Sequence, residues 1–320
     1  MDLVYTFPMS KVITSGSVAY DRIMDYGGLF ADSFVPDKIH NINLSFKVDK
    51  LSVEFGGTAG NVAYSLALLG EQAEIIATVG ADFGSYRAHM LLSGVDPTTI
   101  HEVEGELTAS AVLFTDRADN QIAAYHPGAG GHAYDTPVNT DGRALAIVSP
   151  GCEADMMSLP PYYRRRGLRY LYDPGQQITA LTPEALKDAI TGAHVLFASD
   201  YELGLIAQKT GWAEGSLLQN VPTVVVTYGV EGSRVVTREG DWRVASTPAK
   251  TVIDPTGAGD AYRAGFIKGI FLGLPLQSCG RLGSTVAAYA VETYGTQTHK
   301  FTLQELADRY QKTHGEKLPV

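Results

Sequence analysis

Two acidic residues bracket a turn of small residues in the last third of the chain: Asp254-Pro255-Thr256-Gly257-Ala258-Gly259-Asp260. The apolar pattern after this turn predicts a helix over residues 261–272. The first N–H groups of a helix have no partner within it, and the positive end of its dipole favours an anion. Because Gly257, Ala258 and Gly259 have almost no side chain, their backbone can approach a phosphate closely. Asp260 falls in the first helical turn, where it could accept a proton from an attacking hydroxyl.

A simple glycine turn with a helix-capping acid is the alternative for this stretch. Two acids around Thr-Gly-Ala-Gly form a more specific pattern than a bare Gly-x-Gly. We therefore interpret the stretch as a phosphate-binding loop with an acid beside it.

A second glycine motif, Gly56-Gly57-Thr58-Ala59-Gly60-Asn61, opens a helix predicted over residues 62–69. Its paired glycines let the backbone approach a ligand, and Asn61 can donate and accept at once, which suits two sugar hydroxyls. Asp21 comes two residues after a strand predicted over residues 12–19, and ligands of open α/β sheets gather at the carboxyl ends of strands. Asp21 is thus a candidate for binding a substrate hydroxyl, with an exposed turn acid as the alternative.

Composition limits the class of protein. The 320 residues suffice for one large α/β domain with an insertion or for two domains. The net charge of −10 and the absence of a basic stripe argue against a nucleic-acid partner. Cys152 and Cys279 are far apart and have no His or Cys cluster around them, so we expect a reduced, cytoplasmic protein without zinc. We find neither a signal-peptide pattern nor an apolar run of membrane-spanning length, so no membrane association is expected.

Strands and helices alternate along most of the chain, which predicts a largely parallel sheet with helices on both faces. Two stretches depart from this alternation: residues 25–54, with short strands expected at 39–46 and 48–53, and a hairpin at 109–115 and 121–125. Phe34 and Phe46 in the first stretch would either cover a ligand or form a small core of their own. The other expected strands are 73–79, 145–148, 170–172, 195–198, 223–226, 233–237 and 242–246, and the other helices 85–93, 183–190, 276–292 and 303–314.

These motifs resemble, in their order, those of the ribokinase-like carbohydrate and nucleoside kinases, the PfkB family. Within that family the chain looks most like bacterial adenosine kinases, also through residues 16–21, 126–129 and 173–176. The resemblance implies a ribokinase-like three-layer α/β/α fold with a mostly parallel central sheet and a small β lid. It also implies a single kinase domain over residues 1–320, whose lid is formed by insertions at about 25–54 and 109–126.

The activity that the resemblance implies is ATP-dependent transfer of the γ-phosphoryl group to the 5′-hydroxyl of adenosine, giving AMP and ADP, as in purine salvage. Asp260 would be the base, and the backbone of Gly257, Ala258 and Gly259 the anion hole. The residues that would bind the nucleoside are Asp21, Gly56, Gly57 and Asn61. The residues that would contact ATP are Thr227, Gly229, Gly232 and Asp254. Glu202 would act on Mg²⁺ through water, and a monovalent cation such as K⁺ is left open.

One position departs from the family pattern. The family usually has Asn-x-x-Glu near the magnesium and the phosphates, whereas this chain has Ser199-Asp200-Tyr201-Glu202. The retained Glu202 can still act through metal-bound water. With Ser199 in place of Asn, we expect a weaker or differently tuned affinity for metal–ATP.

Three other functions stay open at this point. A kinase of a free sugar, such as ribose or fructose, would need no aromatic surface, whereas Phe34, Phe46 and Tyr125 offer one to a base. A catalytically inactive nucleotide-binding module is disfavoured by the intact stretch from Asp254 to Asp260. An interaction protein could pair its lid strands with a second subunit. The chain would then be a homodimer through the lid and otherwise a monomer, and such a homodimer is compatible with catalysis.

Overall fold

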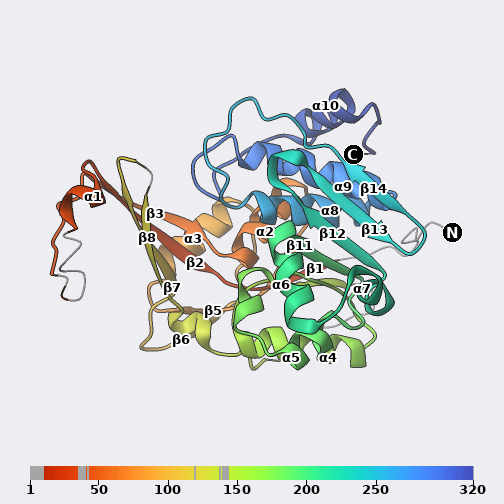
Figure 1. Ribbon diagram of the computed structural model, residues 1–320, viewed down its shortest axis with the longest axis horizontal. Coiled ribbons are helices and arrows are strands. Elements are labelled where there is room, and N and C mark those ends of the chain that lie inside the picture. The colour runs from red at the N-terminus through yellow and green to blue at the C-terminus, as the bar shows by residue number, and fades with distance from the viewer. Residues whose placement is uncertain are drawn as a thin grey trace.

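The structure is a computed structural model that describes residues 11–34, 41, 43–118, 120–136, 138 and 144–319. Its centre is an eight-stranded sheet in the order β14-β13-β12-β11-β10-β9-β1-β4 (Figure 1). Neighbouring strands from β4 to β12 are parallel, and β13 and β14 are antiparallel. The strands are β1 (Lys11–Ser15), β4 (Ala73–Ile76), β9 (Ala144–Val148), β10 (Arg169–Tyr172), β11 (Val195–Ser199), β12 (Thr223–Thr227), β13 (Ser233–Thr237) and β14 (Asp241–Val244).

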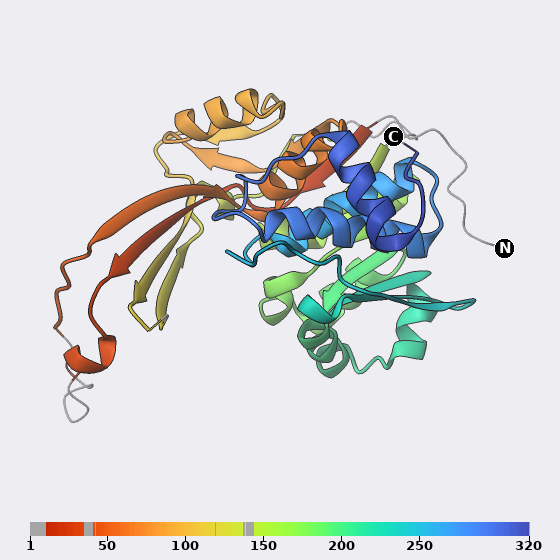
Figure 2. The ribbon, with the colours of Figure 1, turned by 90° about the horizontal axis from the view of Figure 1, so that it is seen from above.

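Helices cover both faces of this sheet, because successive strand residues point to opposite sides. In β9, for example, Leu145 and Ile147 belong to one buried core, and Ala146 and Val148 to the other. The first face carries α2 (Thr58–Leu68), α8 (Ala258–Phe271), α9 (Leu276–Ala290) and α10 (Leu303–His314), and the second α4 (Glu153–Arg165), α5 (Pro183–Ile190), α6 (Asp200–Thr210) and α7 (Glu214–Asn220) (Figure 2). The three-layer arrangement predicted from the sequence is confirmed.

A second sheet of four strands projects from one end of the molecule, and we call it the outer sheet (Figures 1 and 2). Its order is β3-β2-β7-β8, with β2 and β7 parallel and the other pairs antiparallel. Its strands are β2 (Ala19–Tyr26), β3 (Lys50–Gly56), β7 (Ala109–Asp116) and β8 (Gln121–His126), and α1 (Phe30–Ser33) lies at its far end. Smaller elements complete the chain: β5 (Thr78–Gly80), β6 (His101–Val103), α3 (Gly84–Leu92), η2 (Gly128–Gly131), η3 (Gly175–Thr179) and η4 (Gly229–Glu231).

Aromatic rings at the far end of the outer sheet pack against one another. The ring of Phe30 lies 4.9 Å from that of Phe114 and 5.8 Å from that of Phe46, and it also contacts Phe34 at 6.4 Å. None of these rings belongs to the two cores that flank the central sheet. The alternative in which Phe34 and Phe46 form a small core of their own is therefore confirmed.

Most predicted elements are confirmed, but the first strand is wrong. The expected strand over residues 12–19 is two strands in two sheets: β1 ends at Ser15, and β2 begins at Ala19. The chain turns at Gly16, where Thr58 packs so closely that a Cβ atom would clash with it. Asp21 consequently lies within β2 and not in a turn.

Three smaller predictions also change. The expected strand at 39–46 falls partly on residues 39, 40 and 42, which lie outside the described residues, and residues 43–46 form no strand. The strand expected at 48–53 begins at Lys50 and runs to Gly56, and the strand expected at 73–79 is divided between β4 and β5. Among the residues described, no helix is both long and apolar enough to span a bilayer.

Candidate active site

A cleft of about 440 Å³ lies between the central sheet and the outer sheet. It opens at the carboxyl ends of β1, β10, β11 and β12, where ligands of open α/β sheets usually bind. The residues of the predicted site that line this cleft are Asp21, Gly57, Asn61, Glu202, Thr227, Gly257, Gly259 and Asp260. The cleft thus brings together residues that are up to 239 positions apart in the sequence, from Asp21 to Asp260.

The start of α8 forms one wall of the cleft. Gly257 is its N-cap and has a φ of 76°, in the left-handed region that favours glycine. A Cβ atom on Gly257 would lie 2.9 Å from Cβ of Thr296, so no larger residue fits. The helix begins at Ala258, three residues earlier than predicted, and Asp260 lies in its first turn as expected. The free N–H groups of this turn can bind an anion in the cleft.

The carboxyl group of Asp260 is held from α2. Asn61 Nδ2 donates a hydrogen bond of 2.8 Å to Asp260 Oδ2. The Asn61 amide oxygen accepts hydrogen bonds from Thr296 Oγ1 at 2.8 Å and from Gln297 Nε2 at 3.0 Å. These contacts fix which way the Asn61 amide faces and thereby aim the Asp260 carboxyl group.

Burial makes Asp260 a stronger base than an exposed carboxylate. Desolvation raises its pKa to about 6, although the Asn61 hydrogen bond and the Arg263 charge lower it, and Asp173 and Asp21 raise it further. A carboxylate with a pKa near neutral can take a proton from a hydroxyl and later release it. The geometry therefore allows Asp260 to serve as a general base.

Asp21 faces the same cleft from the outer sheet. Desolvation raises its pKa to about 6, and the charges of Asp254 and Glu54 add to this effect. A Cβ atom on Gly56 would lie 2.5 Å from Asp21 Oδ2, and one on Gly57 would lie 2.5 Å from the Ser17 carbonyl oxygen. The two glycines therefore leave the space that Asp21 and the neighbouring backbone occupy.

The remaining predicted residues lie around the cleft and do not line it. Gly56, Ala258, Gly229 and Gly232 are absent from its described wall. Asp254 braces the loop: its Oδ1 accepts from the Thr256 N–H at 2.9 Å and its Oδ2 from the Gly295 N–H at 3.0 Å. A direct contact between Asp254 and ATP stays a prediction, while its structural role is visible.

Ser199 and Glu202 form a capping box at the start of α6. The Ser199 N–H donates to Glu202 Oε2 at 2.7 Å, and Ser199 Oγ accepts from the Glu202 N–H at 3.2 Å. The described residues hold no cluster of three or more His, Cys, Asp or Glu side chains suited to a metal ion. Mg²⁺ often binds through one or two carboxylates, waters and substrate phosphates, so Glu202 at the cleft fits such an ion.

Four residues at the cleft were missed as site residues. Arg263 and Asp173 form a buried ion pair there, with distances of 2.6 and 3.0 Å. Thr296 also lines the cleft, and Gln297 supports Asn61. Asp173 begins the stretch 173–176 that resembles the kinase family. Arg263 follows Asp260 by three residues, which is about one helical turn, so the sequence alone could have placed it on the same side of the helix as Asp260.

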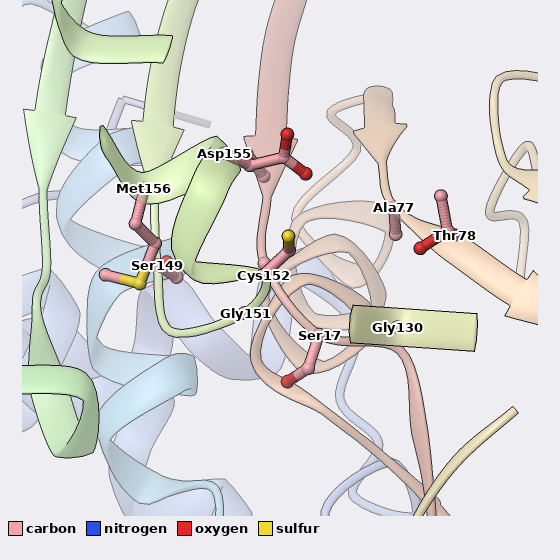
Figure 3. A pocket seen from close by; sticks show the side chains of 11 residues that line it. Ser17, Ala77, Thr78, Gly130, Ser149, Gly151, Cys152, Asp155 and Met156 are labelled. Carbon is pink, nitrogen blue, oxygen red and sulfur yellow. The ribbon is translucent and has the colours of Figure 1, made fainter. Parts of the chain in front are cut away.

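Two other hollows lie away from the start of α8. A cavity of about 10 Å³, room for about one water molecule, lies beside the ends of β1 and β9. Figure 3 shows Cys152 and Asp155 on one side of it and Ala77 and Thr78 opposite. An open groove of about 540 Å³ runs past His101 and includes none of the predicted site residues. The cleft at α8 is therefore the site where polar groups converge.

The fold and the cleft define the class of the chain: it is an α/β phosphotransferase with an alcohol group as acceptor. The sequence pattern of the pfkB family carbohydrate kinases matches residues 9–302, and the chain belongs to this family. The family membership predicted from the motifs is thereby confirmed.

Individual relatives are similar over almost the full length. A nucleoside kinase of Methanothermobacter thermautotrophicus is 32% identical over 290 residues, which cover 89% of this chain and 93% of the relative. The solved nucleoside kinase of Burkholderia thailandensis in complex with inosine has a TM-score of 0.82 and 34% identity, covering 96% and 99% of the two chains. The Methanocaldococcus jannaschii nucleoside kinase, a member of the ribokinase family, has a TM-score of 0.85 and 28% identity, covering 95% and 99%. The ribokinase-family fold is thus confirmed.

The raised pKa of Asp260 predicts how activity depends on pH. A base acts only when it is deprotonated, so kcat/KM should fall about tenfold per pH unit below pH 6 and level off above pH 7. Initial rates from pH 4.5 to 8.5 measure this, with circular dichroism at each pH as the control for folding. A flat profile down to pH 4.5 in folded protein would contradict the prediction.

Proposed function

We propose that the chain is a purine nucleoside kinase. It transfers the γ-phosphoryl group of ATP to the 5′-hydroxyl of adenosine, giving AMP and ADP, as a step of purine salvage in the cytoplasm. The observation that carries this proposal is the convergence of the partly buried Asp260, the start of α8 and Asp21 in one cleft. The relatives support it, because they are nucleoside kinases, and the B. thailandensis enzyme was solved with inosine and with ADP-inosine.

The transfer is an in-line displacement at phosphorus, in which positioning and charge stabilisation supply most of the rate. Asp260 takes the proton of the 5′-hydroxyl. The hydroxyl oxygen bonds to the γ-phosphorus, and the bond between the γ-phosphorus and the leaving oxygen of ADP breaks. The N–H groups at the start of α8 stabilise the charge on the transferred group. Asp21 and Asn61 bind the ribose hydroxyls, and Asn61 also keeps the Asp260 carboxyl group in place.

ATP binds on the side of the cleft where β12 ends. Thr227 lines the cleft there, and Gly229 and Gly232 shape the turn that follows, with positive φ values of 56° and 95°. Glu202 would hold Mg²⁺ through water, and the ion would neutralise charge on the phosphates. Ser199 keeps the Glu202 carboxylate close to the start of α6.

The outer sheet provides the room for a base. Asp21 on β2 is paired with Ala111 on β7, which in turn is paired with Tyr125 on β8, and all three side chains line the cleft. A row that runs from a hydroxyl-binding acid to an aromatic ring suits a ribose with an attached base better than a free sugar. We propose that this sheet is the lid that excludes water during transfer.

The face of the outer sheet that points away from the cleft supports a homodimer. Residues next to Asp21 in β2 alternate in direction, so Arg22 and Met24 lie on this opposite face. The strand pairing places Leu51 and Ile122 in the same row as Met24, and these two side chains are 57% and 47% exposed. Apolar surface of this kind is typical of protein–protein contacts.

An acceptor screen tests the proposed function. The panel of acceptors is adenosine, inosine, guanosine, cytidine, ribose and fructose. We expect ATP consumption with adenosine and inosine, and none with ribose or fructose. AMP and IMP should be the products by chromatography. Turnover only with free sugars would contradict the proposal.

The matched control for this screen is Asp260→Asn, which keeps the shape of the side chain and removes the base. It should lower kcat by about a hundred- to ten-thousand-fold while nucleoside binding persists in calorimetry. If Asp260→Asn turns over normally, the assignment of the base is wrong. If neither protein consumes ATP with any acceptor, the chain is a nucleotide-binding module.

Tyr125 separates a nucleoside site from a sugar site. Tyr125→Ala removes an aromatic contact of about 0.5–1.5 kcal/mol, so kcat/KM for adenosine should fall about 2- to 10-fold. Phe46→Ala is the control, because Phe46 packs in the aromatic cluster at the far end of the sheet. Equal losses in the two variants, or a loss with ribose as large as with adenosine, would argue against a base contact at Tyr125.

Ser199→Asn tests how the metal–nucleotide site is tuned. Asn is as good a helix N-cap as Ser, and it adds an amide oxygen near Glu202, so binding of ADP should become more dependent on Mg²⁺. Calorimetry with ADP at several free Mg²⁺ concentrations measures this without turnover. Ser199→Thr, which retains a hydroxyl cap, is the control, and identical curves for all three proteins would refute the expectation.

A further inference from the structure

Arg263 is a buried cation directly beneath the phosphate-binding turn. It lies on α8 one turn after Gly259, and the residue is only 6% exposed. Its Nε donates to Asp173 Oδ2 at 2.6 Å, and its Nη2 donates to Asp173 Oδ1 at 3.0 Å. Its Nη1 donates to the Gly259 carbonyl oxygen at 3.1 Å. One side chain thus connects the turn at the start of α8 with the segment that follows β10.

The contact with Gly259 constrains the turn itself. A Cβ atom on Gly259 would lie 2.8 Å from Arg263 Nη1, so the guanidinium fills the space that a side chain at 259 would need. The peptide unit between Gly259 and Asp260 is planar, so the direction of its carbonyl also sets the direction of the Asp260 N–H. By holding this carbonyl, Arg263 helps to fix one of the N–H groups at the helix start.

Charge explains why a cation is needed at this place. The described residues that line the cleft include four acids, Asp21, Asp173, Glu202 and Asp260, and a single basic residue, Arg263. A nucleotide brings further negative charge into the same space. Buried ion pairs seldom add stability over apolar packing, so folding alone does not account for this pair. Burial by itself lowers the pKa of Arg263, but the charge of Asp173 and its hydrogen bonds raise it. The charges of Asp260 and Glu202 add to this effect, and together these groups keep the guanidinium charged.

We infer that the Arg263–Asp173 pair is a positioning device for phosphoryl transfer, which holds the anion-binding turn and sets the electrostatic field at Asp260. The inference rests on the proposed kinase function for its role in turnover. Arg263 is a positioning residue, since its hydrogen bonds are with Asp173 and with the Gly259 backbone. The ring of Phe197 lies beside its guanidinium, with Arg263 Cζ 5.4 Å from the ring centre.

Several elements contribute to the field at Asp260. The groups that face it are Asp21 on β2, Asn61 on α2, Tyr86 on α3, Asp173 after β10 and Arg263 on α8 itself. Glu202 on α6 interacts with both members of the pair. Arg263 lowers the pKa of Asp260 and Asp173 raises it, so the two members act in opposite directions.

The test is a titration of Asp260 by NMR of protein labelled with ¹³C at the aspartate carboxyl carbons, with Asp260→Asn to assign the signal. Arg263→Gln should shift the Asp260 midpoint upward, and Asp173→Asn should shift it downward. The double variant should titrate close to the wild type. Arg309→Gln is the matched control, because Arg309 makes a comparable part-buried pair with Glu292 away from the cleft.

Turnover gives a second readout. Arg263→Lys keeps the charge but loses the planar fork, so the Asp260 titration should stay near that of the wild type. Its kcat should fall about 10- to 100-fold with nucleoside affinity unchanged, because the turn is no longer held. Normal kcat in this variant would overturn the positioning of the turn.

The outcomes separate the two proposals. An unchanged Asp260 midpoint in both Arg263→Gln and Asp173→Asn, or the same shift in Arg309→Gln, overturns the electrostatic inference. If Arg263→Gln does not fold, the downward shift in Asp173→Asn decides the question. If the wild type phosphorylates no nucleoside, the proposed function fails, whereas the titration needs no substrate and still decides what the pair does.

Discussion

The hydrogen bond between Asn61 and Asp260 is the contact on which the cleft depends. It joins the first turns of two helices, α2 and α8, each of which begins at a glycine with positive φ. Asn61 can make this bond in only one orientation, because Thr296 and Gln297 occupy its amide oxygen. A single amide group therefore sets the distance between the glycine motif near residue 57 and the acid at residue 260.

Buried charge is the second constraint. The pKa values of Asp21 and Asp260 both rise to about 6 because the cleft desolvates them, and the charge of Asp21 raises the pKa of Asp260 further. The ion pair of Arg263 and Asp173 adds a fixed positive group without changing the net charge of the wall. The cleft thus keeps two carboxylates that can exchange protons near neutral pH, next to a helix start that attracts anions.

Local signals made much of this structure predictable. Helices α5 and α10 were expected with their observed bounds, since a threonine N-cap precedes each and glycine follows α10. The glycine motifs and Asp260 were also visible, because their chemistry lies in consecutive residues. The end of β1 could not be predicted, because apolar residues continue past Gly16 into a strand of a different sheet. Arg263 and Thr296 were missed because their partners, Asp173 and Asn61, lie 90 and 235 positions away.

The aromatic cluster of the outer sheet has a consequence for how such a protein can change. Phe30, Phe46 and Phe114 pack on one another and not on the cores of the central sheet. The far end of the outer sheet is therefore stabilised by its own aromatic contacts. Substitutions along β7 and β8 can therefore accumulate without loosening the scaffold that holds Asp260. The outer sheet can therefore change in sequence while the start of α8 and the contacts of Asp260 are retained.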